Sequence, residues 1–257
     1  MTASIQVDQD PQVQYLLRIG DTALVLGQRI AEWCGHAPII EEDIALTNMA
    51  LDLIGQARAV LTRAGQVDGH GLDEDQLAFL RVERDYRNPT LVELPRGDFA
   101  FTVVRNTIVS TFLKLLWNRL ADSSDAELAA IAGKAIKEAR YHQQHAADWV
   151  ARLGDGTGES RRRMEAALDA AWIYTNELFA ADAVDDAARG SGLGPCWSDL
   201  KDTWLAEMTD ILAEGGLQVP GAQPFVSAGK QGVHSEHMGH MLSEMQYLQR
   251  TYPGGVW

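Results

Sequence analysis

The sequence has 257 residues, 46% of them hydrophobic, which is enough to bury one sizeable core. Its 36 acidic and 22 basic residues give a formal net charge of -14, which repels a phosphate backbone and an anionic lipid surface. We therefore expect neither nucleic acid nor a membrane among the partners of this protein.

The cysteines and the polar start of the chain favour a cytoplasmic protein. Cys34 and Cys196 lie far apart and form no CxxC motif, so we interpret them as two reduced thiols. The start carries Asp8 and Asp10 in place of a signal peptide, and nowhere do about 18 uncharged apolar residues follow one another. We expect a single domain over residues 1–257, in which residues 1–12 form a flexible N-terminal extension.

Apolar residues in the first half recur at positions i, i+3, i+4 and i+7, which is the spacing of amphipathic helices, and no alternating run predicts a strand. Asp98 has the position and chemistry of an N-cap, since its carboxylate can accept backbone N–H groups of the first turn. The predicted helices cover residues 13–33, 41–64, 73–86 and 98–120.

The second half continues this helical pattern. Ser124 and Glu127 form a predicted capping box at the start of a helix that ends near Gly154. Residues 215–232 are rich in glycine and proline and predict an ordered loop that could touch a partner. The remaining predicted helices cover residues 161–181, 198–214 and 234–250. Long helices joined by short loops predict an all-α fold, a ferritin-like helical bundle with additional C-terminal helices.

A ferritin-like di-iron centre needs one Glu from each of two helices and a Glu-x-x-His pair from each of two others. The first helix offers Glu32, but the helix after Asp98 has no Asp or Glu between residues 99 and 120. Where the two pairs are expected, the sequence reads Asp52-Leu-Ile-Gly and Glu138-Ala-Arg-Tyr, with His142 one residue late. We therefore predict no catalytic, cofactor-binding or metal-binding residue, and interpret these positions as degenerate di-iron positions.

Charged residues at the degenerate positions could replace the metal by ion pairs. Lys134, Glu138 and His142 follow one another at a spacing of four, so a lysine ammonium could lie against the carboxylate on the same helical face. One hypothesis is a buried network that joins Lys134 and Glu138 to Asp21, Glu32 and Asp52. The alternative is that Lys134 points to solvent, where such a pair contributes only about 0.3–0.5 kcal/mol.

A second cluster of polar residues lies near the C-terminus. His234, His237, His240 and Glu244 share one face of the last predicted helix. Two histidines at i and i+3 could bind a metal, so His237 and His240 remain candidates. The alternative is a polar helix face that docks on a partner, which is favoured because no second ligand-bearing helix is evident.

Four segments, residues 24–38 (LVLGQRIAEWCGHAP), 51–58 (LDLIGQAR), 134–142 (KAIKEARYH) and 244–250 (EMQYLQR), resemble one known family. It is the family of the structural, non-catalytic subunit of bacterial phenylacetyl-CoA epoxidase, also called phenylacetate-CoA oxygenase. The resemblance extends from about Gln14 to the C-terminus and implies a ferritin-like fold and a scaffold role.

The resemblance also implies partners and cofactors. The partner would be a homologous catalytic subunit that carries the di-iron centre. A reductase component with FAD, an iron–sulfur cluster and NADPH would supply electrons, so that oxygen epoxidises the ring of phenylacetyl-CoA during aerobic phenylacetate degradation.

Two other functions remain open from the sequence. The chain could be a self-sufficient ferritin-like metal-binding protein, although Gly55 and Tyr141 at expected ligand positions disfavour this. It could also be a helical interaction module with no enzyme attached, which copurification of a catalytic subunit would exclude.

Overall fold

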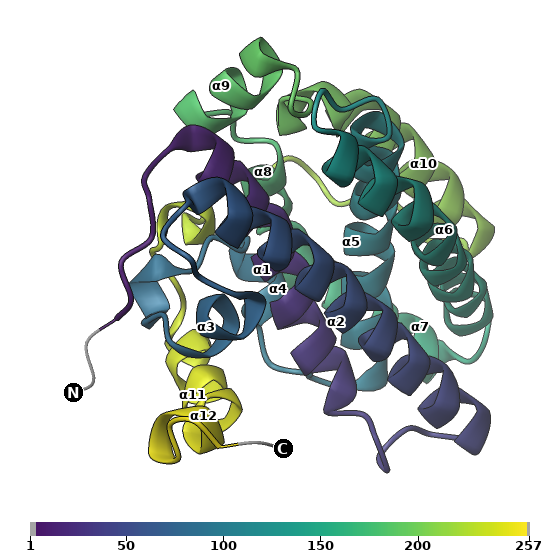
Figure 1. Cartoon of the computed structure of the whole chain (residues 1–257). Helices are drawn as coiled ribbons and strands as arrows, with labels where there is room; N and C mark the ends of the chain where they lie inside the picture. The colour runs from purple at the N-terminus through teal and green to yellow at the C-terminus, as the bar shows by residue number, and fades with distance from the viewer. Residues whose placement is uncertain (1–3, 256–257) are drawn as a thin grey trace.

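The computed structural model describes residues 4–255, and within them every regular element is a helix (Figure 1). Four long helices form the central bundle: α1 (Pro11–Ala31), α2 (Ile40–Asp68), α5 (Phe99–Leu120) and α6 (Ala126–Gly154). Helix α1 pairs with α2, and α5 pairs with α6, each as an antiparallel hairpin. The predicted all-α, ferritin-like class is confirmed.

Helix α1 begins at Pro11, which suits the first helical position because its missing N–H would have no partner there. The Asp10 carboxylate caps this end by accepting the Gln12 N–H. Residues 11 and 12 therefore belong to a helix, and the predicted flexible extension is wrong for them. Asp8 also contacts the fold, because its N–H donates to Asp68 Oδ1 at 2.6 Å. Residues 1–3 of that extension lie outside the described residues.

Helix α5 is the core helix, and Asp98 caps it as predicted by accepting the Phe101 N–H. Within residues 4–255 it is the one helix long and apolar enough to cross a membrane, with a mean hydropathy of 1.3, but 78% of that stretch is buried inside the fold. Its apolar character is therefore that of a helix surrounded by other helices.

The capping box predicted for α6 is wrong. Asp125 is the N-cap, and its Oδ1 accepts the N–H groups of Glu127 and Leu128 at 3.0 Å. The Ser124 hydroxyl instead donates to Ser191 O at 3.1 Å. A carboxylate one residue later is the better cap because it satisfies two orphan N–H groups and neutralises Arg63 at 2.8 Å.

Shorter helices cover the bundle: α3 (Glu74–Phe79), α4 (Thr90–Glu93), α7 (Gly158–Trp172), α8 (Thr175–Leu178), α9 (Ala183–Ser191), α10 (Lys201–Glu214), α11 (Glu236–Met245) and α12 (Tyr247–Thr251), with 3-10 turns at Glu83–Asp85, Trp197–Leu200 and Gly229–Gln231. Helices α7 and α10 pack beside α5 and α6, whereas α11 and α12 lie near α3 (Figure 1). The predicted additional C-terminal helices are present, but as several short pieces.

Buried polar side chains interrupt three helices that the sequence predicts as continuous. The helix predicted over 73–86 stops after α3, where Arg81 turns into the core. The helix predicted over 234–250 breaks at Gln246, whose buried amide donates to Arg81 O at 2.9 Å. The helix predicted over 161–181 ends at Trp172, whose carbonyl accepts the Thr175 hydroxyl at 2.8 Å. Tertiary hydrogen bonds thus override the local helical pattern.

Candidate functional site

A small cavity lies at the centre of the four-helix bundle, where a ferritin-like protein holds its metals. All four long helices contribute to it. Its lining consists of Leu26 and Ile30 from α1, Met49, Leu53 and Gln56 from α2, Asn106, Ser110 and Leu113 from α5, and Ala139 and His142 from α6.

The two inward-facing i, i+3 pairs differ from those predicted. On α2 they are Leu53 and Gln56, and on α6 they are Ala139 and His142. The positions predicted for the two Glu-x-x-His pairs are therefore wrong by one residue, because on both helices the inward-facing pair begins one residue later in the chain. A shift of one residue rotates a side chain by about 100° around the helix, and burial decides which alternative faces inward.

These residues do not fit a di-iron centre. Carboxylate positions on α2 and α6 hold Leu53 and Ala139, which have no donor atom, and one histidine position holds the amide Gln56. His142 is the one cavity residue of the expected ligand type. Over residues 4–255, no three or more His, Cys, Asp or Glu side chains cluster in a way that could hold a metal ion. We therefore derive no metal chemistry from this centre.

Two polar bridges join α2 to α6 beside the cavity. His142 Nε2 lies 3.0 Å from Asp52 Oδ2, and Gln56 Nε2 donates to Glu138 Oε2 at 2.9 Å. Lys134 does not take part in the interior, because its side chain is 81% exposed and its ammonium lies 3.8 Å from Glu138. The solvent-exposed alternative for Lys134 is the correct one.

The other members of the predicted network lie elsewhere. Glu32 is 38% exposed at the side chain and binds Arg29 at 2.6 Å. Asp21 is fully buried, but it pairs with Arg81, which follows α3 in the chain. The predicted single buried network is therefore wrong, since its residues separate into local pairs.

Burial controls the charge state of His142. It lowers the pKa of the imidazole below its ordinary value of about 6.5, although the Asp52 carboxylate opposes this effect. The ring is therefore neutral at neutral pH. A histidine whose pKa is lowered by folding binds a proton more tightly in the unfolded chain than in the folded one. Its contribution to the free energy of unfolding is therefore fully present above about pH 6.5, and it is lost as the pH falls through the folded-state pKa.

We expect an NMR titration to place the pKa of His142 below that of a free histidine. The His142→Gln variant would identify its ring signals by their disappearance. A midpoint above about 6.5 would contradict the dominance of burial at this position.

The C-terminal histidines have separate roles. His234 is fully buried at the side chain, with Nδ1 2.6 Å from Glu93 Oε2 and Nε2 3.1 Å from Tyr86 O, so it attaches the segment before α11 to α4. The Glu93 carboxylate raises the pKa of His234 although burial alone would lower it. His237 and His240 belong to no group of three metal-type side chains in the described part of the chain.

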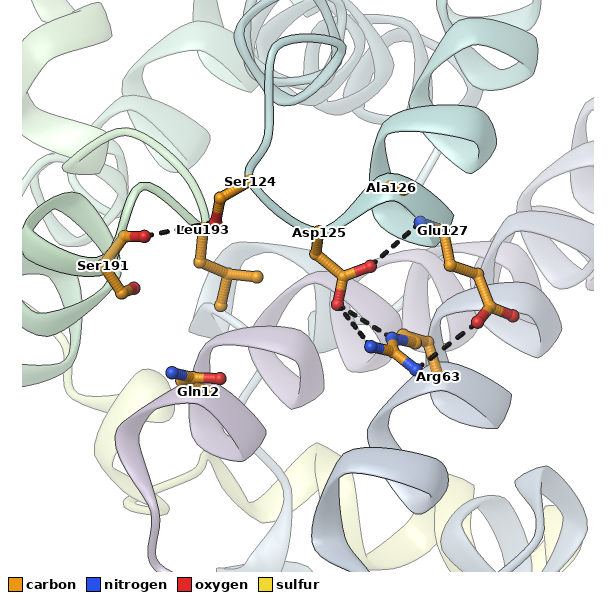
Figure 2. A pocket seen from close by; sticks show the side chains of 8 residues that line it. All are labelled: Gln12, Arg63, Ser124, Asp125, Ala126, Glu127, Ser191 and Leu193. Carbon is orange, nitrogen blue, oxygen red and sulfur yellow. Dashed lines mark hydrogen bonds and ion pairs between the residues drawn. The ribbon is translucent and has the colours of Figure 1, made fainter.

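An open hollow also lies where the ends of α2, α6 and α9 meet (Figure 2). Its lining consists of Gln12, Arg63, Ser124, Asp125, Ala126, Glu127, Ser191 and Leu193. The only cation among these residues, Arg63, already pairs with Asp125 at 2.8 Å and Glu127 at 3.4 Å. We therefore interpret the hollow as a helix junction rather than as a binding site.

The four-helix bundle is that of a ferritin-like protein, and the side chains that line its centre do not fit a di-iron site. Comparison with known proteins gives the particular family. The model of the family described as phenylacetic acid catabolic protein matches residues 1–257, and the chain belongs to that family. The chain is also 48% identical over 243 residues to the C subunit of 1,2-phenylacetyl-CoA epoxidase from Escherichia coli (strain K12), covering 95% of this chain and 98% of that protein. The resemblance found in the sequence is confirmed.

Proposed function

We propose that this chain is a non-catalytic structural subunit of a multicomponent monooxygenase that epoxidises the ring of phenylacetyl-CoA. The near full-length match to a subunit of such an epoxidase supports membership of the complex. The observation that carries the non-catalytic role is the bundle centre, where Leu53 and Ala139 take positions that a di-iron centre needs for carboxylates.

The proposal divides the chemistry between components. A homologous subunit would hold the di-iron centre, and a reductase with FAD and an iron–sulfur cluster would pass two electrons from NADPH. One oxygen atom of O2 enters the aromatic ring as the epoxide and the other leaves as water. This chain would contribute a rigid helical scaffold against which the catalytic bundle packs.

The α2–α6 bridges suit such a scaffold. In a di-iron protein the metals themselves join the four helices through their ligands. Here the Asp52–His142 and Gln56–Glu138 contacts join two of the same helices without a metal. The alternative of a self-sufficient metal-binding protein lacks a comparable observation in its favour.

The test is turnover by the reconstituted complex. We expect oxygen- and NADPH-dependent consumption of phenylacetyl-CoA when the chain is coexpressed with the catalytic subunit and supplied with reductase, and none from the chain with reductase alone. In that complex the His142→Gln variant should keep kcat within about twofold, because a side chain outside the reaction does not stabilise its transition state.

A loss of kcat of more than about a hundredfold, with the complex intact, would assign His142 to the chemistry and contradict the proposal. Exposed Gln144, on the same helix, provides the matched control as Gln144→Ala. If the catalytic subunit and the reductase consumed phenylacetyl-CoA at the same rate without this chain, the reaction would need no scaffold, and the proposal would be contradicted.

A further inference from the structure

The last two helices lie at the edge of the molecule. Helices α11 and α12 are found beside α3 and away from α6 (Figure 1), and α11 contacts the 3-10 turn at Glu83–Asp85. We call residues 234–255 the C-terminal arm. A segment at the edge of a fold can open and close while the rest of the structure stays folded.

The arm begins at His234, whose side chain has no exposed surface. Both ring nitrogens of His234 face oxygen acceptors, because Nδ1 lies 2.6 Å from Glu93 Oε2 and Nε2 lies 3.1 Å from Tyr86 O. A neutral imidazole carries one N–H and can donate to only one of these oxygens, whereas the protonated ring donates to both. The geometry therefore favours the imidazolium.

The Glu93 side chain is arranged as an ionised acceptor. It has no exposed surface. Besides its contact with His234, its Oε1 accepts the Ser235 N–H at 2.5 Å, and its Oε2 accepts the Asn88 amide at 2.9 Å. A protonated carboxyl group would carry a donor into this set of donors. The contact between Glu93 and His234 is therefore a buried ion pair, in which each charge is compensated only while the other is present.

Charged side chains from each neighbouring element surround this pair. They are Asp21 and Arg29 of α1, Arg81 and Asp85 around the 3-10 turn, Arg87 before α4, Lys230 before the arm, and the exposed Glu236 within it. Several of them form pairs of their own: Asp21 with Arg81, Arg29 with Glu32, and Lys230 with Asp185. Burial alone would lower the pKa of His234, but the hydrogen bond and the charge of Glu93 raise it above its ordinary value.

We propose that the protonated His234 holds the C-terminal arm on the bundle, and that its deprotonation releases the arm. Loss of the proton leaves one ring nitrogen with a lone pair that faces an oxygen acceptor, either Tyr86 O or the Glu93 carboxylate. It also leaves the Glu93 charge buried without a counter-ion. Both effects disfavour the closed arm and disappear when the arm opens to water.

The direction of the pH dependence follows from proton linkage. Folding raises the pKa of His234 above the value of about 6.5 that an exposed histidine has, so the closed arm binds the proton more tightly than the open arm. The attachment is therefore fully present below about pH 6.5 and is lost as the pH rises through the folded-state pKa. Each unit of this pKa shift corresponds to about a tenfold change in the opening equilibrium.

Hydrogen–deuterium exchange of the full chain between about pH 6.5 and pH 9 tests this proposal. We expect the protection of residues 238–250, corrected for the intrinsic exchange rate, to fall over this range while the protection of α10 stays constant. The fall should be about tenfold for each unit by which an NMR titration places the pKa of His234 above about 6.5. His142, whose pKa is lowered by burial, stays neutral over the same range.

Two variants separate this attachment from other effects of pH. His234→Gln has no titrating group at this position, so the protection of the arm should not change with pH, whether or not the glutamine holds the arm. His240→Gln removes an exposed histidine of the same helix and should behave as the wild type.

Three results would overturn the proposal. The first is an arm whose protection in the wild type is constant over the pH range. The second is an equal fall in wild type and His234→Gln, because another group would then be titrating. The third is an equal fall in the arm and in α10, because the proton would then stabilise the whole fold and not the attachment of the arm.

Discussion

Replacing Asp21 by asparagine should lower the free energy of unfolding by about 3–5 kcal/mol, the cost of breaking a buried ion pair. The side chains of Asp21 and Arg81 are both fully buried, and their contact is bidentate. Asp21 Oδ2 also accepts the Arg87 N–H at 2.8 Å. Burial alone would lower the pKa of Arg81, but the Asp21 carboxylate raises it, so the guanidinium stays charged and loses its counter-ion in the variant.

Urea denaturation followed by circular dichroism measures this effect. Asp75→Asn is the matched control, because Asp75 is exposed on α3, the helix just before Arg81. A loss below about 1 kcal/mol, the range of exposed pairs, would show that the Asp21–Arg81 pair is not desolvated.

Replacing Glu177 by glutamine should cost about 3 kcal/mol and release the segment before α11, because buried donors lose their acceptor. Glu177 is 1% exposed. Its carboxylate accepts the N–H groups of Thr90 at 2.9 Å and Lys230 at 2.7 Å and the Ser227 hydroxyl at 2.5 Å. A glutamine amide has only one oxygen and would place its NH2 group against these donors.

Limited proteolysis combined with denaturation separates the local effect from the global one. We expect cleavage within residues 218–228 to accelerate in Glu177→Gln at protease concentrations that leave the wild type intact. Glu165→Gln, whose side chain is 54% exposed in a surface pair with Arg161, should behave as wild type. Equal cleavage rates in the three proteins would show that Glu177 does not hold this loop.

The long helices are predictable from the sequence because each carries a long amphipathic or apolar pattern and an identifiable end. Helix α5 agrees with the prediction at its Asp98 cap and at Leu120. Helix α9 is not predicted from the sequence because it is short and begins at the Asp182 cap. The Asp182 carboxylate is fixed by an ion pair with Arg18, a buried residue of α1. Contacts between distant segments of this kind leave no local pattern.

The candidate centre was only partly predictable. His142 is recognisable in the sequence as a ligand type, but Asn106 and Ser110 are not, because an amide and a hydroxyl are not among the side chains that a di-iron centre requires. Asn106 and Ser110 stand out as polar residues four apart on the apolar α5, which is a usable signal for an inward-facing position. Which of two adjacent residues faces the centre could not be predicted, because it depends on how α2 and α6 pack.

The central claim is that this chain is the metal-free scaffold of a di-iron oxygenase, and iron analysis tests it most directly. Iron should be measured in the purified chain alone and in the complex coexpressed with its catalytic subunit. The account predicts iron near zero in the chain alone and about two iron ions per catalytic subunit in the complex. About two iron ions bound to the isolated chain would contradict it, since Leu53 and Ala139 leave the bundle centre without the carboxylates that hold them.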